Sequence, residues 1–360
     1  MRYNGASAGR GNYTRARDAE ELIYLTRKSV AKLLGAKKAG NIVLTSNVTE
    51  SLNLILKGFL NNGDGVLTSS IEHNAMWRPL HSLQRDKHIN IHTFHCTTEG
   101  TVDLQEIKEQ LGKDIRLLAL VHGSNVLGNV FPLDEIIRLA HERDIPVLVD
   151  AAQTAGVFPL DIEALDVDFL AFTGHKGLLG PTGTGGFYIR EGLELRTLKE
   201  GGTGTISKSP FQPNSVPDRY EAGTMNTVGL VGLKAGAEYL LETGIDIIRG
   251  HEIALMTKML AGLARIENME VYGTGNAHLR LGLVTFNIKG VNPYDAAFWL
   301  DQHAGIMVRA GLHCSPQAHK VMGTLEMGAL RASVGCFSTM QDVIHLLEAM
   351  EDCTKSLRRS

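Results

Sequence analysis

The feature that most constrains the fold of this chain is the alternation of short apolar segments with amphipathic segments in its first half. Several apolar segments are apolar on both faces, which is typical of strands covered by helices on both sides of a sheet. The predicted strands are residues 41–45, 65–69, 89–94, 117–122, 146–151, 168–173 and 186–189, and helical patterns lie at 19–34, 49–60 and 133–143. This order predicts an α/β fold with a doubly wound, mostly parallel sheet.

The second half of the chain is organised differently. A loop rich in Gly, Ser and Pro at 200–217 is followed by helical patterns at 228–242 and 250–266. Further predicted strands at 283–288, 306–310 and 330–334 alternate with helices at 293–303 and 340–350. We therefore predict a large domain over residues 1–242 and a smaller C-terminal α/β domain over residues 243–360.

Composition excludes several classes of protein. The 36 basic and 39 acidic side chains give a formal charge of -3, which argues against a dedicated nucleic-acid-binding protein. No apolar run approaches the roughly 18 residues of a membrane span, and the polar segment 1–17 predicts no signal peptide. The four cysteines are scattered, so we expect no disulfide framework, no metal site, and a reduced, cytoplasmic protein.

The strongest chemical signal is an aspartate and a lysine that follow successive strands. Asp150 ends a predicted strand in VDAAQ (149–153), and Lys176 follows the next one in TGHKG (173–177). We expect Gly174 and Gly177 to let a ring approach this lysine. A lysine for a Schiff base and an aspartate for a ring nitrogen are the groups with which proteins hold pyridoxal 5'-phosphate (PLP). The alternative is a structural ion pair between the two side chains.

Three further segments place polar side chains after predicted strands. In VTE (48–50), Thr49 and nearby N–H groups suit a phosphate, or Thr49 is simply a helix N-cap. In EHNA (72–75), His73 suits stacking on a planar ring, with a structural role as the alternative. In SNVLG (124–128), Asn125 suits a hydrogen bond to a phenolic oxygen. We expect these side chains to meet at the carboxyl edge of the sheet.

These motifs, together with YEAGTMNT (220–227) and RAGLHCSP (309–316), resemble those of the NifS-like cysteine desulfurases, in the same order. That family belongs to the class V aminotransferases, which have the PLP fold type I. RAGLHC is similar to the R-x-G-x-H-C motif of the family's SufS-type, shorter-loop group. Members usually carry an opening strand resembling Y-L-D-N-A-A-T, which has no counterpart before the match at residues 4–11.

The resemblance implies a set of residues around the PLP ring. Lys176 would form the Schiff base, and Asp150 would hold the ring nitrogen. His73 would stack on the ring and is counted among the catalytic residues. Asn125 and Gln153 would face the phenolic oxygen, with Asn125 also near the substrate.

The resemblance also implies a phosphate site. Thr49, Thr173 and His175 would hold the phosphate, together with N–H groups near Val48, where many relatives carry a second threonine. Thr224 would reach the phosphate of a partner subunit, which implies a homodimer.

One cysteine distinguishes the desulfurase resemblance from the wider class. Cys314 would be the nucleophile, because a thiolate attacks sulfur and nearby cationic groups lower a thiol's pKa. We expect Arg309, His313 and His319 to supply that positive charge, and the alternative is that Cys314 is a small buried residue. Arg331 would bind the substrate carboxylate, with Arg309 as a second contact. We interpret Cys96, Cys336 and Cys353 as small buried hydrophobic residues.

The activity implied is a PLP-dependent cysteine desulfurase that converts L-cysteine to L-alanine and leaves a persulfide on Cys314. A sulfur-acceptor protein remains open as a partner. The alternatives are a selenocysteine lyase or cysteine C–S lyase of the same fold, or a homologue with impaired catalysis. An NAD-dependent dehydrogenase is disfavoured because its glycine fingerprint is absent.

Overall fold

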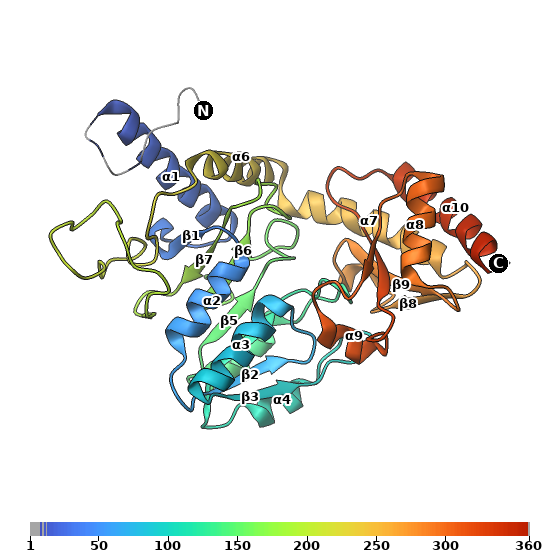
Figure 1. Ribbon diagram of the computed structural model, residues 1–360, viewed down its shortest axis with the longest axis horizontal. Helices are drawn as coiled ribbons and strands as arrows, with labels where there is room; N and C mark the ends of the chain where they lie inside the picture. Colours follow the sequence, from blue (N-terminus) through green and yellow to red (C-terminus); the bar gives the residue numbers. More distant parts are fainter. Residues whose placement is uncertain (1–7, 9–10, 12, 359–360) are drawn as a thin grey trace.

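The larger of two sheets forms the centre of the molecule. The computed structural model describes residues 8, 11 and 13–358, so most of the segment matched at residues 4–11 lies outside the described residues. The sheet has seven strands in the order β1-β7-β6-β5-β4-β2-β3 (Figure 1). They are β1 (Ile42–Thr45), β2 (Gly65–Ser69), β3 (Asn90–Phe94), β4 (Ile115–Val121), β5 (Val147–Asp150), β6 (Phe169–Thr173) and β7 (Gly185–Ile189). Only the pairs that β7 makes are antiparallel in it, so the predicted mostly parallel α/β sheet is confirmed.

Helices cover both faces of this sheet. They are α1 (Thr14–Leu33), α2 (Val48–Phe59), α3 (Asn74–Lys87), α4 (Leu104–Gln110), α5 (Leu133–His141) and α6 (Thr227–Thr243). Successive residues of β4 belong to different apolar clusters: Leu117 packs with the cluster of α2 and α3, and Leu118 with that of α1, α5 and α6. A strand buried on both faces has to be apolar at every position, which explains the continuous Leu and Val run.

A second, four-stranded antiparallel sheet lies in the C-terminal part, in the order β10-β11-β9-β8. Its strands are β8 (Met269–Tyr272), β9 (Leu283–Ile288), β10 (Arg309–Gly311) and β11 (Ala329–Ser333), and its helices are α7 (Ile245–Leu263), α8 (Pro293–Ala304), α9 (Pro316–Met322) and α10 (Met340–Leu357). Side chains of α7, α8 and α10 form an apolar core with this sheet. Thr285 and Arg331 of the sheet donate hydrogen bonds to the carbonyls of Val126 and Asn125, which follow β4 of the large sheet. These bonds place the small sheet against the carboxyl edge of the large one.

Several predicted boundaries are wrong. The strand predicted at 306–310 forms only as Arg309–Gly311, α1 begins at Thr14 and not at 19, and α10 continues to Leu357. Helices α3, α4 and α9 and strand β8 were not predicted from the sequence. In α3 the apolar positions form a narrow stripe in a polar segment that contains Pro79, and β8 is partly exposed. The domain division after residue 242 stays a prediction.

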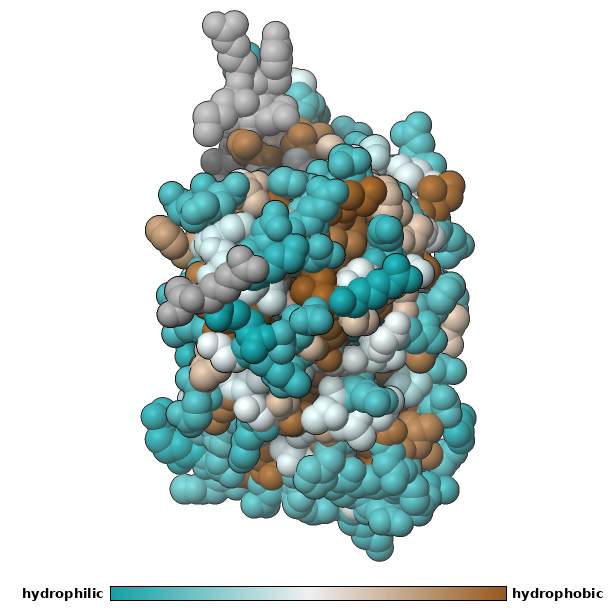
Figure 2. Space-filling view, turned by 90° about the vertical axis from the view of Figure 1, so that its right-hand side faces the viewer, coloured by the Kyte–Doolittle hydropathy of each residue, from teal (hydrophilic) through white to brown (hydrophobic). Residues whose placement is uncertain are grey.

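The surface of the small-domain end is largely hydrophilic with apolar patches between the polar side chains (Figure 2). Met307 and Phe337 are the most exposed large apolar side chains of the C-terminal part, at 87% and 71%. None of the helices formed by the described residues is both long and apolar enough to cross a membrane.

Candidate active site

The loops after β2, β4, β5 and β6 bring the predicted site residues to one edge of the large sheet. Asp150 is the last residue of β5 and is 2% exposed. The backbone N–H of Ala152 donates to its Oδ1 at 2.9 Å. Burial raises the pKa of Asp150, against this hydrogen bond and the charge of Lys176, which lower it. Among the described residues, Asp150 therefore has a backbone hydrogen-bond donor but no ion-pair partner within 4.0 Å.

Lys176 lies beyond the end of β6 and is partly buried. Burial lowers its pKa, the charges of Arg331 and Arg309 lower it further, and those of Asp150 and Cys314 act in the opposite direction. Among the ion pairs of the described residues there is none between Lys176 and Asp150, so the structural ion pair is not what the fold forms. A lysine of lowered pKa has a larger fraction of free amine, the form that attacks carbonyl carbon.

The glycines beside Lys176 have a second, structural role, and the expectation that they let a ring approach stays a prediction; Gly177 does line the cavity beside Lys176. A Cβ on Gly174 would lie 2.1 Å from the Thr184 Oγ1, and one on Gly177 would lie 2.6 Å from the Ala155 carbonyl oxygen. In the direction that a Cβ would take, both positions are therefore occupied by other parts of the protein. The two glycines allow the loop to pack against its neighbours, and so fix Lys176 indirectly.

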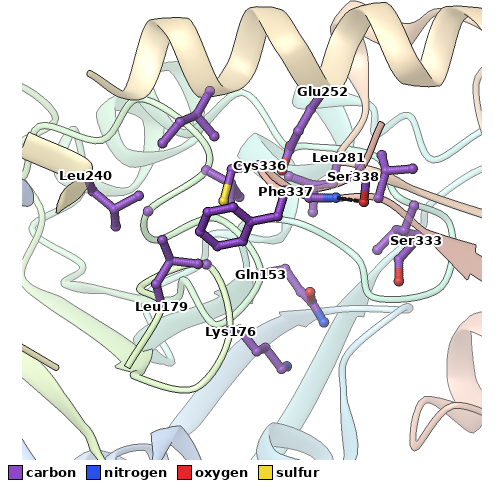
Figure 3. A pocket seen from close by; sticks show the side chains of 18 of the residues that line it. Gln153, Lys176, Leu179, Leu240, Glu252, Leu281, Ser333, Cys336, Phe337 and Ser338 are labelled. Carbon is purple, nitrogen blue, oxygen red and sulfur yellow. Dashed lines mark hydrogen bonds between the residues drawn. The ribbon is translucent and has the colours of Figure 1, made fainter. Parts of the chain in front are cut away.

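A cavity of about 560 Å³ opens beside Lys176 and is also lined by Gln153 and Arg331. Figure 3 shows Lys176 and Gln153 on one side of it, with Glu252 and Cys336 opposite. Glu252 is buried, and burial raises its pKa to about 7. Its Oε2 has no hydrogen-bond partner among the described residues. The cavity is large enough for a small amino acid and has a cationic side and a carboxyl side.

His73 and Asn125 lie at the same edge. His73 caps the N-terminus of α3, where its Nδ1 accepts a hydrogen bond from the Ala75 N–H at 3.0 Å. Burial, with the charges of Lys176 and Arg309, lowers its pKa to about 4, so the imidazole is neutral at pH 7. The structural alternative and the ring-stacking role of His73 are compatible, since the cap uses only Nδ1. Asn125 is buried and its Nδ2 donates to the carbonyl of His313 at 2.7 Å.

The residues predicted for the phosphate lie at the ends of β1 and β6. Thr49 is exposed and is not the N-cap of α2, because the Asn47 side chain accepts the Glu50 N–H at 3.0 Å and has that role. Val48 is buried in the first turn of α2. The Thr173 Oγ1 lies 3.0 Å from the Nδ1 of the exposed His175.

Thr224 lines a separate hollow of about 150 Å³, between the loop after β1 and the segment before α6. Ser46 and Glu50 line it as well. None of the residues that line the Lys176 cavity lines this hollow, so within one subunit the fold does not bring Thr224 to that cavity.

Two arginines lie opposite each other on neighbouring strands of the small sheet. The antiparallel register of β10 and β11 pairs Arg309 with Arg331, and like charges at such positions repel. Arg331 donates from Nη1 to the carbonyl of Asn125 at 2.9 Å, while its buried Nε has no partner among the described residues. Arg309 donates from Nη2 to the Sγ of Cys314 at 3.4 Å. The pair therefore places two guanidinium groups, both capable of donating to an anion, beside the thiol.

Cys314 is exposed in a loop that is docked on the large sheet, so the interpretation as a small buried residue is wrong. Its carbonyl accepts the Asn74 N–H at 2.8 Å, and the Ser315 hydroxyl donates to the Glu72 carbonyl at 3.1 Å. His313 and Cys314 both adopt left-handed backbone angles, with φ of 53° and 59°. Such residues cost of order 1–3 kcal/mol each and persist where surrounding contacts hold them.

The predicted contribution of the two histidines to the positive charge at Cys314 is wrong. Burial lowers the pKa of His313 and of His319 to about 4 in each case. Both rings are almost completely buried and are neutral at pH 7. The cationic groups near the thiol are Arg309, Arg331 and Lys176. Arg309 contacts the Cys314 Sγ, and burial lowers the pKa of Arg331 and of Lys176, whereas the charge of Cys314 acts to raise both.

A comparison with known protein families identifies the family of this chain. The model of the family "Aminotransferase class-V" matches residues 1–346. The chain belongs to the class V aminotransferases. The predicted family and the PLP fold type I are thereby confirmed.

Relatives and solved structures of this class V family carry a common name. A probable cysteine desulfurase of Methanothermobacter thermautotrophicus is 35% identical over 357 residues, covering 97% of this chain and 88% of that protein. A cysteine desulfurase of Escherichia coli (strain SE11) is 35% identical over 360 residues, covering 97% and 87%. The apo structure of a cysteine desulfurase from Thermococcus onnurineus NA1 superposes with a TM-score of 0.93 at 34% identity, covering 98% of this chain and 89% of that one. The crystal structure of the cysteine desulfurase CsdA (S-sulfonic acid) from Escherichia coli superposes with a TM-score of 0.87 at 31% identity, covering 97% of this chain and 87% of that one.

Two buried carboxyls of this class V chain were missed by sequence reasoning. Glu72 is fully buried beside His73, its Oε1 accepts the Ser69 hydroxyl and the Val121 N–H, and its Oε2 has no partner among the described residues. Its signal is its place in EHNA directly after a strand. Glu252 lies within α7 and has no such signal. Cys336, predicted to be a buried hydrophobe, is only partly buried and lines the cavity, whereas Cys96 and Cys353 are buried.

Proposed function

We propose that this protein is a PLP-dependent cysteine desulfurase that converts L-cysteine to L-alanine and transfers the sulfur to Cys314 as a persulfide. The observation that carries the proposal is the contact between the Arg309 Nη2 and the Cys314 Sγ at 3.4 Å, directly opposite Arg331. It places a thiol beside a guanidinium pair suited to an amino-acid carboxylate. The names of the relatives at 35% identity support the same activity.

The donor set of this chain fits PLP. Lys176 offers an amine whose pKa burial lowers, and Asp150 offers a buried carboxylate for the ring nitrogen. His73 has its Nδ1 occupied by the α3 cap, so the rest of its neutral ring is available to stack. Asn125 and Gln153 are the proposed partners of the phenolic oxygen. When bound, PLP supplies an electron sink for the negative charge that develops on the substrate carbon.

We assign the phosphate to the first turn of α2 and to two side chains at and just beyond the end of β6. A helix N-terminus favours an anion because its N–H groups are unpaired. Thr49, the N–H of Val48, Thr173 and His175 would hold the phosphate. As the family resemblance implies, Thr224 would reach the phosphate of a second subunit, and the enzyme would work as a homodimer. In its own subunit, Thr224 lines a hollow together with Ser46 and Glu50, beside the first turn of α2.

Each of these residues would have its own role in the reaction. Arg331, and Arg309 as a second contact, bind the carboxylate of L-cysteine, and the unpartnered Nε of Arg331 gives it a second donor. Lys176 removes the proton from the substrate Cα and later returns one. Arg309 stabilises the Cys314 thiolate, which attacks the substrate sulfur. As the S–S bond forms, the C–S bond breaks, its electron pair stays on carbon, and that carbon takes up a proton to give L-alanine.

The test is incubation of the purified protein with PLP and L-cysteine, with alanine and sulfane sulfur measured together. Wild type should form both, and Lys176→Ala should form neither while losing the absorbance of bound PLP. Cys314→Ser should bind PLP and form little alanine. Full alanine production by Cys314→Ser would contradict the persulfide step, and faster turnover of L-selenocysteine in that variant would favour a selenocysteine lyase.

The partners and compartment of the enzyme belong to the same proposal. A persulfide on an exposed cysteine can be passed to a thiol of an acceptor protein, so we propose such a protein as a partner. A reactive thiol of this kind is preserved in a reducing compartment, for which we propose the cytoplasm.

A further inference from the structure

Behind the Cys314 loop lies a chain of three hydrogen-bonded side chains, Thr324, His319 and His313, here called the imidazole chain. The Thr324 Oγ1 lies 2.8 Å from the His319 Nδ1, and the His319 Nε2 lies 3.1 Å from the His313 Nδ1. The His313 Nε2 lies 3.2 Å from the carbonyl oxygen of Arg309. The two rings stack with centroids 5.3 Å apart at 24°.

The direction of every hydrogen bond in the imidazole chain follows from its last member. A carbonyl oxygen only accepts, so the His313 Nε2 carries a proton and donates to Arg309. In a neutral ring the His313 Nδ1 then accepts, so the His319 Nε2 donates to it. The His319 Nδ1 accepts in turn from the Thr324 hydroxyl. All ring nitrogens are satisfied with both histidines neutral, in agreement with their burial.

This arrangement adds a second set of contacts to those that hold the reactive loop at the edge of the large sheet. From the large sheet, Asn125 holds the His313 carbonyl and the Asn74 N–H holds the Cys314 carbonyl. From α9 and the turn after it, the imidazole chain holds the His313 ring and, through it, the backbone of Arg309. The residue whose carbonyl is held this way is the one whose guanidinium contacts the Cys314 Sγ.

Uncharged side chains suit the position of the imidazole chain, because cationic groups already surround the nearby thiol. The charged groups that face the His313–His319 pair are Arg309 and Arg331, and Arg309, Arg331 and Lys176 surround the thiol. A lysine or arginine in place of His319 would add positive charge to three cations that already repel one another. Neutral imidazoles donate and accept hydrogen bonds without adding to that repulsion.

We propose that His319 is a positioning residue for sulfur transfer: through His313 it fixes the backbone at Arg309, so that the guanidinium and the Cys314 thiol keep their contact. This rests on the proposed function. His319 touches neither thiol nor cofactor site and acts only through the chain. Because a misplacement of about 1 Å at a reacting group can lower a rate 100-fold, loss of the support should be seen in the sulfur-transfer step.

The experiment compares two replacements of His319 in the PLP-loaded enzyme. His319→Phe keeps a ring of similar size and removes the donor to His313, and His319→Gln keeps an N–H donor at a similar reach. We expect His319→Phe to lower kcat for alanine formation at least 10-fold with KM for L-cysteine changed less than about 3-fold, because Asn125 holds Arg331 independently. His319→Gln should recover most of kcat.

A second readout does not depend on turnover. The rate at which iodoacetamide alkylates Cys314 at pH 7, followed by peptide mass spectrometry, should change at least 3-fold in His319→Phe and stay within 2-fold of wild type in His319→Gln. Should His319→Phe fail to fold, Thr324→Val removes the hydroxyl that orients His319 and should change kcat and alkylation in the same direction by a smaller factor.

Equal kcat and equal alkylation rates in folded His319→Phe, or Thr324→Val in its place, and wild type would overturn the positioning role. So would a lower melting temperature with both rates unchanged, since that is the result of a purely structural role. If wild type made no alanine, the proposed function would fail, while the alkylation rates would still decide whether the imidazole chain positions Cys314.

Discussion

Replacing Glu72 by glutamine should stabilise the protein relative to wild type, and this gain in the free energy of unfolding should be larger at pH 7 than at pH 5. Glu72 is fully buried, and burial, with a smaller contribution from the charge of Asp150, raises its pKa to about 8 against hydrogen bonds from Ser69 and Val121. The ordinary value is 4.5. In the folded protein Glu72 is therefore protonated at pH 7, and in the unfolded chain it is ionised.

The sign and size of the effect follow from this difference. A folded pKa above the unfolded one gives stability that is complete below 4.5 and is lost as the pH rises toward 8. With about 1.4 kcal/mol per pKa unit, the loss is about 1 kcal/mol at pH 5 and about 3 kcal/mol at pH 7. Glutamine is neutral at both values, and its carbonyl can accept from Ser69 and Val121. The advantage of Glu72→Gln should thus grow by about 2 kcal/mol between pH 5 and pH 7.

Urea denaturation of both proteins at pH 5, 6 and 7 measures this growth directly as a difference in the free energy of unfolding. Glu99→Gln, at an exposed position, is the matched control for the loss of one carboxyl group. A constant difference between Glu72→Gln and wild type over this range would refute the reasoning, because it would mean that Glu72 binds the same number of protons folded and unfolded.

The remaining predictions concern the anion site and the backbone. Arg331→Lys should raise KM for L-cysteine about 10- to 100-fold, because lysine cannot offer two parallel donors to a carboxylate; an unchanged KM in steady-state kinetics would argue against the assignment. Asn47→Ala should cost about 1 kcal/mol in urea unfolding through loss of the α2 cap, and Thr49→Ala clearly less, with equal losses as the contrary result. Gly156→Ala, with φ of 89° and a Cβ 2.4 Å from the Gly177 carbonyl oxygen, should lower stability by more than about 1 kcal/mol and by more than Gly192→Ala, whose Cβ at φ 90° meets nothing; similar losses would show that the contact is unimportant.

The large sheet could be predicted from sequence because its strands are buried on both faces and leave a continuous apolar signal. The edge that carries the site could be predicted as well, because the carboxyl ends of parallel strands converge. Asp150 ends β5, and Lys176 follows the neighbouring strand β6. Helix α3 was missed for a local reason, since its apolar stripe is narrow and interrupted by Pro79.

Other features depend on contacts between residues far apart in the chain. Asn125 and His313 are 188 residues apart, and no pattern near either one indicates the bond that joins them. The pairing of Arg309 with Arg331 depends on the register of β10 and β11, which the sequence shows only as a short strand with uncertain bounds. The charge state of His313 and His319 depends on burial, which their spacing in RAGLHCSPQAH does not report.

The error about the histidines changes the physical account of the reactive thiol. If they were charged, five cations would surround Cys314, and the cross-strand repulsion of Arg309 and Arg331 would be worse. With neutral histidines, the positive charge is confined to the three groups that the proposed reaction needs: two that bind anions and one that moves a proton. Burial already lowers the pKa of Arg331, so its charge is incompletely compensated before an anion arrives. A substrate carboxylate and a thiolate each relieve that repulsion, and binding is therefore strongest where the fold has left positive charge unpaired.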